Sequence, residues 1–345
     1  MILHPGILAL LCGSGIALLM LLYAAGLGVR ILRQWDYRSS SEKQLQLERK
    51  TYLVSTIVSY VIGFELFSGL LFIFTVDDIH PLLTGAMCAT GSLNANPFGW
   101  YALYGKILLF FAGAVWLTLN HVDGRAEDFP LVKTKYALLL ALVPLIAGQY
   151  ALQAAYFLSL DPEVITSCCG SLFSTASSGI AAELAALETR PAMAAFYGSG
   201  LLFLVNAFGV LRARSAFPRY LCTLSAALFF PVSIAAIVSF VSIYIYQLPT
   251  HHCPFDLLQK NYGFIGYPLY SSLFAGTLFG LLPGLFQPLK KRSSIGPELQ
   301  QLETKWVYTA MAATLSFLLL ASWPVLFSPF KMANHAPFQQ IRMIR

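Results

Sequence analysis

The sequence predicts an all-α, polytopic integral membrane protein with about eight transmembrane helices. Of its 345 residues, 57% are hydrophobic and 11% are charged, and the mean hydropathy is +0.67. Soluble domains carry roughly 25% charged residues, so a soluble protein of this composition could not cover its own surface. In lipid, only helices and closed barrels satisfy every backbone polar group. The apolar runs are continuous and about twice as long as a barrel strand, which favours helices.

Windows of about twenty apolar residues, the length that crosses ~30 Å of hydrocarbon, indicate the spans. We treat residues 1–345 as a single transmembrane domain. The eight predicted helices are Ile7–Val29, Tyr52–Val76, Tyr101–Leu119, Tyr136–Leu158, Ala194–Leu211, Tyr220–Leu248, Pro268–Leu289 and Trp306–Leu326. A cleaved signal peptide has basic residues before its apolar stretch, and this segment has none. We therefore expect the first helix to be retained.

The positions of Lys and Arg predict the orientation. The loops after the first, third, fifth and seventh helices, with the residues that flank them, hold 16 of the 22 basic residues. Such a bias marks the cytoplasmic side, so both termini are expected outside, in a bacterial inner (plasma) membrane. The net charge of +6 is therefore a topology signal and does not indicate nucleic-acid binding. Cations beside aromatic rings, such as Lys135–Tyr136 and Arg219–Tyr220, are expected to anchor helices at the headgroup layer.

This orientation gathers most thiols and imidazoles on the outer side, in three long extracytoplasmic loops. Four of the six cysteines and five of the six histidines fall there. The candidate metal ligands are His80 and Cys88 after the second helix, Cys168 and Cys169 after the fourth, and His251, His252 and Cys253 after the sixth. Thiolate and imidazole together suit Cu(I) or Zn(II). Since adjacent residues rarely ligate one ion together, we expect one or two of residues 251–253 to bind.

Two other interpretations of these cysteines stay open. In an oxidising compartment they could form structural disulfides, or they could exchange disulfides with a partner or a quinone. The CxxC spacing that lowers a thiol pKa is absent, and Cys168–Cys169 would close only as a strained vicinal ring. Haem is not expected, because no histidine pair lies within helices at one depth and CxxCH is absent.

The second signal is a charge inside an apolar run. Glu65 lies deep in the second predicted helix, and Lys106 lies in the third, its antiparallel neighbour. A carboxylate near mid-membrane is costly unless it is paired or protonated, and it often marks a functional position. We expect an intramembrane charge pair, with either a structural role or a proton or cation step. Outside the spans, Asp256 and Lys260 are four residues apart and are expected to form a local pair.

The predicted function is a transporter or permease-type subunit that captures Cu or Zn at the outer face. No phosphate-binding loop, GxSxG elbow or HExxH motif occurs, so any ATP use would need a separate soluble ATPase. An extracytoplasmic thiol or metal protein is the other expected partner, besides the lipid bilayer. The alternatives are a quinone-linked thiol–disulfide oxidoreductase and a non-catalytic scaffold subunit of a larger complex.

Overall fold

The computed structural model describes residues 1–36, 41–126, 129–166, 187–213, 215–249, 251–291 and 295–330. These ranges form helices joined by turns, and no strand occurs within them. Eight helices in the described ranges are long and apolar enough to cross a membrane, which confirms the predicted class and number of spans. The chain is therefore a multi-pass membrane protein in contact with lipid. Its sidedness stays a prediction.

The chain divides into two compact units, which are described separately. Unit 1 comprises Met1–Ser167 and Leu289–Gln301, and unit 2 comprises Cys168–Pro288 and Leu302–Arg345. The sequence-based description of one transmembrane domain stays a prediction.

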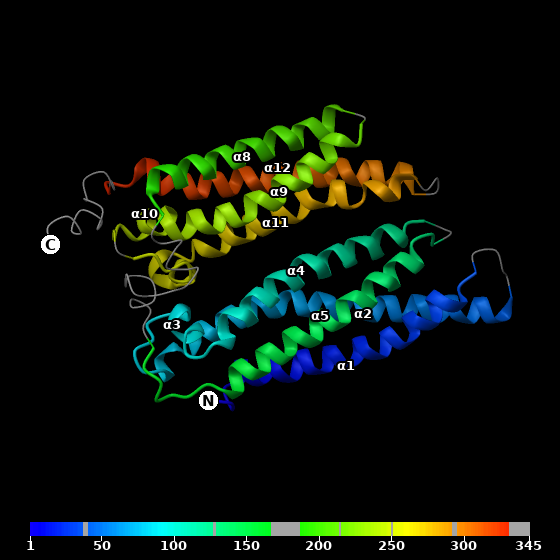
Figure 1. The fold of residues 1–345 in the computed structure, drawn as a ribbon, viewed down its shortest axis with the longest axis horizontal. Coiled ribbons are helices and arrows are strands. Elements are labelled where there is room, and N and C mark those ends of the chain that lie inside the picture. Colours follow the sequence, from blue (N-terminus) through cyan, green and yellow to red (C-terminus); the bar gives the residue numbers. More distant parts are fainter. Residues whose placement is uncertain are drawn as a thin grey trace. The chain divides into compact units, whose positions relative to one another are not determined.

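Unit 1 is built on four long helices. They are α1 (Pro5–Gln34), α2 (Glu42–Asp78), α4 (Phe98–Asp123) and α5 (Val132–Leu158), with the short η1 (His80–Leu82) and α3 (Ala89–Leu93) between α2 and α4. Both α1 and α4 pack against α2 and α5, so the four helices close into a bundle (Figure 1). Its core contains the fully buried side chains of Leu21, Trp116 and Leu139.

In unit 1 the loops after α1 and α4 lie at one end of the bundle, and the segments after α2 and α5 lie at the other. At the end that carries the basic loops, Asn120 donates a hydrogen bond to Ser59 Oγ at 2.9 Å. At the opposite end, Asn96 donates to the Tyr156 carbonyl at 2.9 Å. Within this unit, the segment after α2 and the segment after α5 therefore lie together, away from the basic loops.

Helix α2 is longer than the prediction, which began at Tyr52. It starts at Glu42, and the Ser41 side chain caps it by accepting a hydrogen bond from the Gln44 amide at 3.4 Å. A hydropathy window detects only the apolar part of a helix. The polar residues before Tyr52 are mostly good helix formers, so the helix continues through them.

Unit 2 packs its helices around a cluster of aromatic rings. Its elements are α8 (Thr189–Arg212), α9 (Phe217–Ala236), the π-helix η2 (Ile237–Val241), α10 (Ser242–Tyr246), η3 (Asp256–Leu258), η4 (Lys260–Tyr262), α11 (Gly266–Leu285) and the part of α12 (Gly296–Phe327) from Leu302 onward. Helix α9 packs against α8 and α11. The rings of Phe196, Phe229 and Phe317 meet with centroids 5.7–6.2 Å apart.

The sixth span is continuous from Phe217 to Tyr246 and contains the π-helical turn η2. A π turn shifts the hydrogen-bond register, so some carbonyl groups become available to side chains. The span ends at Gln247, whose φ of 58° lies in the left-handed region and turns the chain out of the helix.

Two of the cations expected to lie at the headgroup layer are buried instead. Lys135 donates to Asp123 Oδ2 at 2.8 Å, and the exposed fractions of these side chains are 4% and 0%. Arg219 Nε donates to both oxygens of Glu303, at 2.9 and 3.0 Å. A buried cation needs a counter-charge. Each of the two side chains therefore joins one helix to another, and their role as headgroup anchors stays a prediction.

Candidate metal centre

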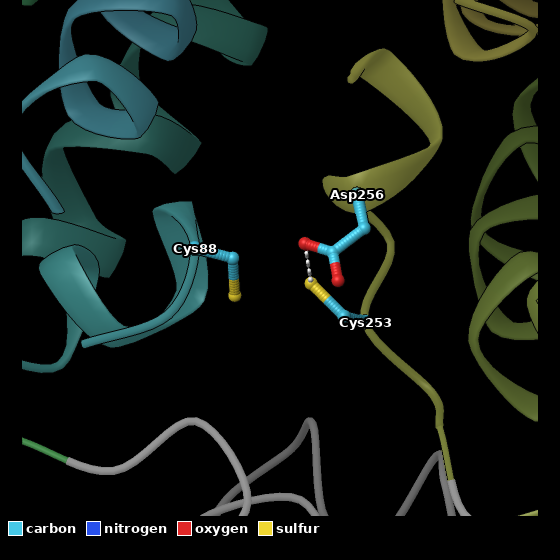
Figure 2. Close-up of side chains that lie close together, drawn as sticks. All are labelled: Cys88, Cys253 and Asp256. Carbon is cyan, nitrogen blue, oxygen red and sulfur yellow. Dashed lines mark hydrogen bonds between the residues drawn. The ribbon is translucent and has the colours of Figure 1, made fainter. Parts of the chain in front are cut away.

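The candidate site lies in unit 2, in the segment between α10 and α11. Cys253 is 1% exposed, and Asp256 begins the short helix η3 three residues later. Figure 2 shows the Cys253 sulfur turned toward the Asp256 carboxylate. A single turn of chain thus brings a thiol and a carboxylate into contact.

Asp256 contacts two residues of the predicted cluster, one with each carboxylate oxygen. The Cys253 thiol donates to Oδ1, with sulfur and oxygen 3.2 Å apart. His251 Nε2 lies 2.6 Å from Oδ2. Imidazole, thiol and carboxylate are the three side-chain groups that bind zinc in proteins. Asp256 therefore contacts two of the candidate ligands, His251 and Cys253, and is itself a third candidate ligand.

Two tyrosine hydroxyls hold the backbone of this segment. Tyr246, the last residue of α10, donates to the Cys253 carbonyl at 2.6 Å. Tyr270 of α11 donates to the Pro254 carbonyl at 2.7 Å. Hydrogen bonds of this kind behind a ligand orient it and tune a metal site. The position of Cys253 is thus fixed from both flanking helices.

Aromatic rings line the same segment. The ring centroid of Tyr246 lies 4.6 Å from that of His251 and 4.4 Å from that of Tyr262. Burial raises the pKa of Tyr262, and the nearby Asp256 and Cys253 raise it further. Tyr262 therefore stays a neutral phenol at pH 7.

His252 does not share the contacts of its neighbour His251. Its Nδ1 lies 2.9 Å from the carbonyl oxygen of Val238, in the π-helix. A carbonyl only accepts, so Nδ1 carries the proton and the neutral ring has its lone pair on Nε2. Burial lowers the pKa of His252 and the adjacent His251 lowers it further, against the opposing effect of the Val238 hydrogen bond. His252 is therefore neutral at pH 7.

The lowered pKa of His252 predicts a pH-dependent stability. In the unfolded chain its pKa is about 6.5, so on acidification the unfolded state binds the proton first. We expect the thermal midpoint to fall between about pH 7.5 and pH 5.5, and to fall less in His252→Gln. The same change in the exposed His121 serves as the control for a surface histidine. Equal pH slopes for wild type and His252→Gln would contradict the assignment.

Sequence reasoning assigned Asp256 the wrong partner. It was expected to pair with Lys260, but no ion pair joins them in the described part of the chain. The i,i+4 rule needs one continuous helix. Here η3 and η4 are separate short helices with the extended residue Gln259 between them. The close spacing of His251, Cys253 and Asp256 was the signal that could have identified the carboxylate.

The candidates after the second helix belong to unit 1. His80 begins η1, and its Nδ1 donates to the Asp77 carbonyl. Cys88, labelled in Figure 2 at the start of α3, is 1% exposed. Asp77 Oδ1 accepts a hydrogen bond from the Ala89 amide at 3.1 Å. Asp77 therefore stabilises the N-terminus of α3.

Cys168 and Cys169 lie outside the described residues. The chain just before them is held within unit 1, since the Thr166 amide donates to the Thr84 carbonyl at 2.9 Å. A Cβ on Gly85 would lie 2.4 Å from the Thr166 carbonyl oxygen, so this close approach requires glycine. Among the described residues, Cys12 and Cys222 are free cysteines.

The structure brings together the two residues of the expected intramembrane pair. Lys106 Nζ lies 3.2 Å from Glu65 Oε2, and the exposed fractions of the two side chains are 2% and 1%. Ser68 bridges them: its hydroxyl lies 3.1 Å from Glu65 Oε2 and accepts from Lys106 at 2.7 Å. The pair thus forms one network that joins α2 to α4.

Comparison with known proteins adds no further assignment. No protein-family model matches the chain, and no match was found among curated proteins or solved structures. A functional assignment therefore rests on the chemistry of the side chains.

Proposed function

We propose that the protein is a multi-pass membrane transporter or permease-type subunit that binds a soft transition metal, Zn or Cu, at its extracytoplasmic face. The metal is the transported substrate. One observation carries the proposal: a single carboxylate, Asp256, contacts both the imidazole of His251 and the thiol of Cys253.

The imidazole, thiol and carboxylate together favour binding of a divalent soft metal ion. Zn(II) binds sulfur, nitrogen and oxygen donors, whereas Cu(I) prefers the thiolate and the imidazole. With the Cys253 thiol deprotonated, thiolate and carboxylate supply two negative charges, which a divalent ion neutralises. Binding then releases the thiol proton to solvent, so affinity rises with pH.

The burial of the three residues suggests how an ion enters. The His251 side chain is 29% exposed, the Asp256 side chain is 12% exposed, and Cys253 is 1% exposed as a residue. An ion arriving from water therefore meets His251 first and reaches the thiol last. An ion that passes from water and His251 to the buried Cys253 thiolate ends on its strongest ligand. Such a site favours capture of a scarce ion over its rapid release.

The outer location of the site follows from the charge bias. Within the sixth span, Arg219 lies near the start of α9 and the site follows the end of α10. If the basic loops face the cytoplasm, as their composition predicts, the site faces the other side, in a bacterial inner membrane. There it could receive metal from an extracytoplasmic thiol or metal protein, while a soluble ATPase could bind the opposite face.

The deciding experiment measures metal binding by the purified full-length chain in lipid nanodiscs, with reductant present. Zn(II) and Cu(I) are titrated separately in competition with a chelator of known affinity. We expect about one equivalent of Zn(II) per chain. Cys253→Ser should lower the affinity by about 10- to 100-fold, because oxygen replaces the sulfur ligand.

Cys222→Ser is the matched control, because Cys222 is a buried thiol of the same unit that contacts the Gly280 carbonyl, 3.7 Å away. It should bind metal like the wild type. Equal loss in both variants, or binding of less than a tenth of an equivalent by the wild type, would refute capture. In that case, thiols that oxidise reversibly with an added quinone would favour the oxidoreductase, and inert thiols would favour a scaffold subunit.

A further inference from the structure

Three buried ion pairs occur among the described residues, and one of them differs from the other two. Both oxygens of Asp123 are occupied, one by Lys135 and the other by the Leu131 amide, each at 2.8 Å. Both oxygens of Glu303 accept from Arg219. Glu65 differs, because its Oε1 is buried and has no hydrogen-bond partner within the described ranges.

The position of Glu65 makes this difference costly. It lies 13 residues from the start and 11 from the end of the apolar stretch Tyr52–Val76, near the middle of the predicted span. An unpaired lone pair of an ionised carboxylate at such a depth is destabilising. A purely structural ion pair would be expected to satisfy both oxygens, as the other two pairs do.

The other helices of unit 1 bring polar groups to the same level. Gly13 of α1 lies against the Phe64 ring, where an added Cβ would be 2.5 Å from Cζ. Gly105 of α4 lies against Gln149 of α5, where an added Cβ would be 3.1 Å from Cγ. These contacts align Ser14, next to Gly13, and Gln149 with the level of Glu65 and Lys106.

Ser14 and Gln149, like Glu65, each have a buried oxygen without a hydrogen-bond partner among the described residues. Both residues are at most 2% exposed. Ser14 Oγ and Gln149 Oε1 are buried without a hydrogen-bond partner in the part of the chain that the structure describes. Three helices therefore each contribute one unsatisfied oxygen to one level. The Ser14 hydroxyl can donate but makes no hydrogen bond to Glu65, so the buried Oε1 of the carboxylate is left without a donor.

We propose that Glu65 takes up and releases a proton inside the membrane, with Lys106 and Ser68 stabilising its ionised form. A hydronium ion gives its proton to Oε1: an O–H bond of hydronium breaks and an O–H bond on Glu65 forms. The neutral acid then no longer leaves an ionised oxygen without a partner at this depth. The Lys106 ammonium keeps its 2.7 Å contact with Ser68 Oγ, and the reverse step returns the proton to water.

Among the residues that the structure describes, few other charged or titratable groups lie near this carboxylate. Lys106 is the cation in contact with it, from α4. Helix α1 presents the uncharged Ser14 at this level, and α5 presents the uncharged Gln149, with the Tyr150 hydroxyl near Gly15. Helix α3 carries no charged residue, and Cys88 at its start is the nearest titratable group of that element. The proton equilibrium of Glu65 should therefore depend chiefly on Lys106.

The test is an infrared pH titration of the full-length protein in lipid bilayers. A protonated carboxyl group has a C=O stretch that carboxylates lack. The other carboxyl groups gain this band in both proteins, so Glu65 is observed in the difference between wild type and Glu65→Gln. We expect that difference to show an added C=O band on acidification. Lys106→Met should alter the pH at which this difference band appears, because the ionised form loses its counter-charge. Asp123→Asn, which changes a fully satisfied buried carboxylate, should keep the wild-type band.

Identical titrations of wild type and Glu65→Gln would overturn the proposal, since Glu65 would then stay ionised throughout. A second measurement needs no variant. Dicyclohexylcarbodiimide modifies protonated carboxyl groups within membranes, and mass spectrometry locates the product. We expect modification of Glu65 that accelerates as the pH falls and none of Asp123. Equal modification of both residues, or a rate independent of pH, would contradict proton exchange at Glu65.

Discussion

Asp256→Ala is expected to lower the Zn(II) affinity by more than about 100-fold, the largest loss among single changes at the site. The change removes one ligand group and also removes the contact that holds the other two. Without the carboxylate, neither the His251 imidazole nor the Cys253 thiol keeps the partner that now orients it. The measurement is the same chelator competition, with reductant present.

Two comparisons make this result specific. Asp256→Asn keeps one acceptor oxygen, so it should bind zinc more tightly than Asp256→Ala and less tightly than the wild type. Asp161→Ala removes an exposed carboxylate that accepts from the Glu163 amide at 3.0 Å, and should leave the affinity unchanged. If Asp256→Ala binds zinc as tightly as wild type, Asp256 is not part of the site.

Arg219→Met is expected to lower the free energy of unfolding by about 3–5 kcal/mol. The change leaves Glu303 buried without the guanidinium that now donates to both its oxygens. An uncompensated buried charge costs more than the intact pair contributes. Denaturant unfolding in mixed micelles, followed by circular dichroism, measures the loss.

The double variant Arg219→Met with Glu303→Met separates the charge from the packing. Replacing a whole buried pair by apolar groups is often nearly neutral, so the double variant should recover most of the loss. Arg125→Met is the control, since the Arg125–Glu298 pair is 40% and 44% exposed and should contribute less than about 1 kcal/mol. Equal losses in the single and double variants would rule out an unpaired charge as the cause.

The sequence predicts the fold class well because lipid imposes a simple rule. Each span must be a long apolar helix, and the windows of hydropathy locate all eight. The same windows miss what happens at helix ends. They could not show that α2 begins at Glu42, or that Lys135 turns inward to reach Asp123. Those features depend on capping, helix propensity and the position of a neighbouring helix.

The candidate site is predicted in part, for a different physical reason. Residue types indicate which groups can bind a metal, so His251 and Cys253 are evident from the sequence. Which groups meet depends on the short helix η3 and on two tyrosines from flanking helices. The Asp256 carboxylate was therefore assigned to Lys260. Conversely, Glu65 and Lys106 could be paired in advance, because antiparallel neighbours fix the depth of both residues.

The length of α2 sets how the chain meets its aqueous surroundings. At 1.5 Å per residue, its 37 residues extend about 55 Å, whereas the hydrocarbon layer is about 30 Å thick. Even at an ordinary tilt, about 20 Å of the helix lies outside the hydrocarbon layer, mostly at the depth of the headgroups. The polar residues from Glu42 to Thr51 therefore continue the span as helix into the headgroup layer, so this end of α2 meets water as ordered helix rather than as an irregular loop.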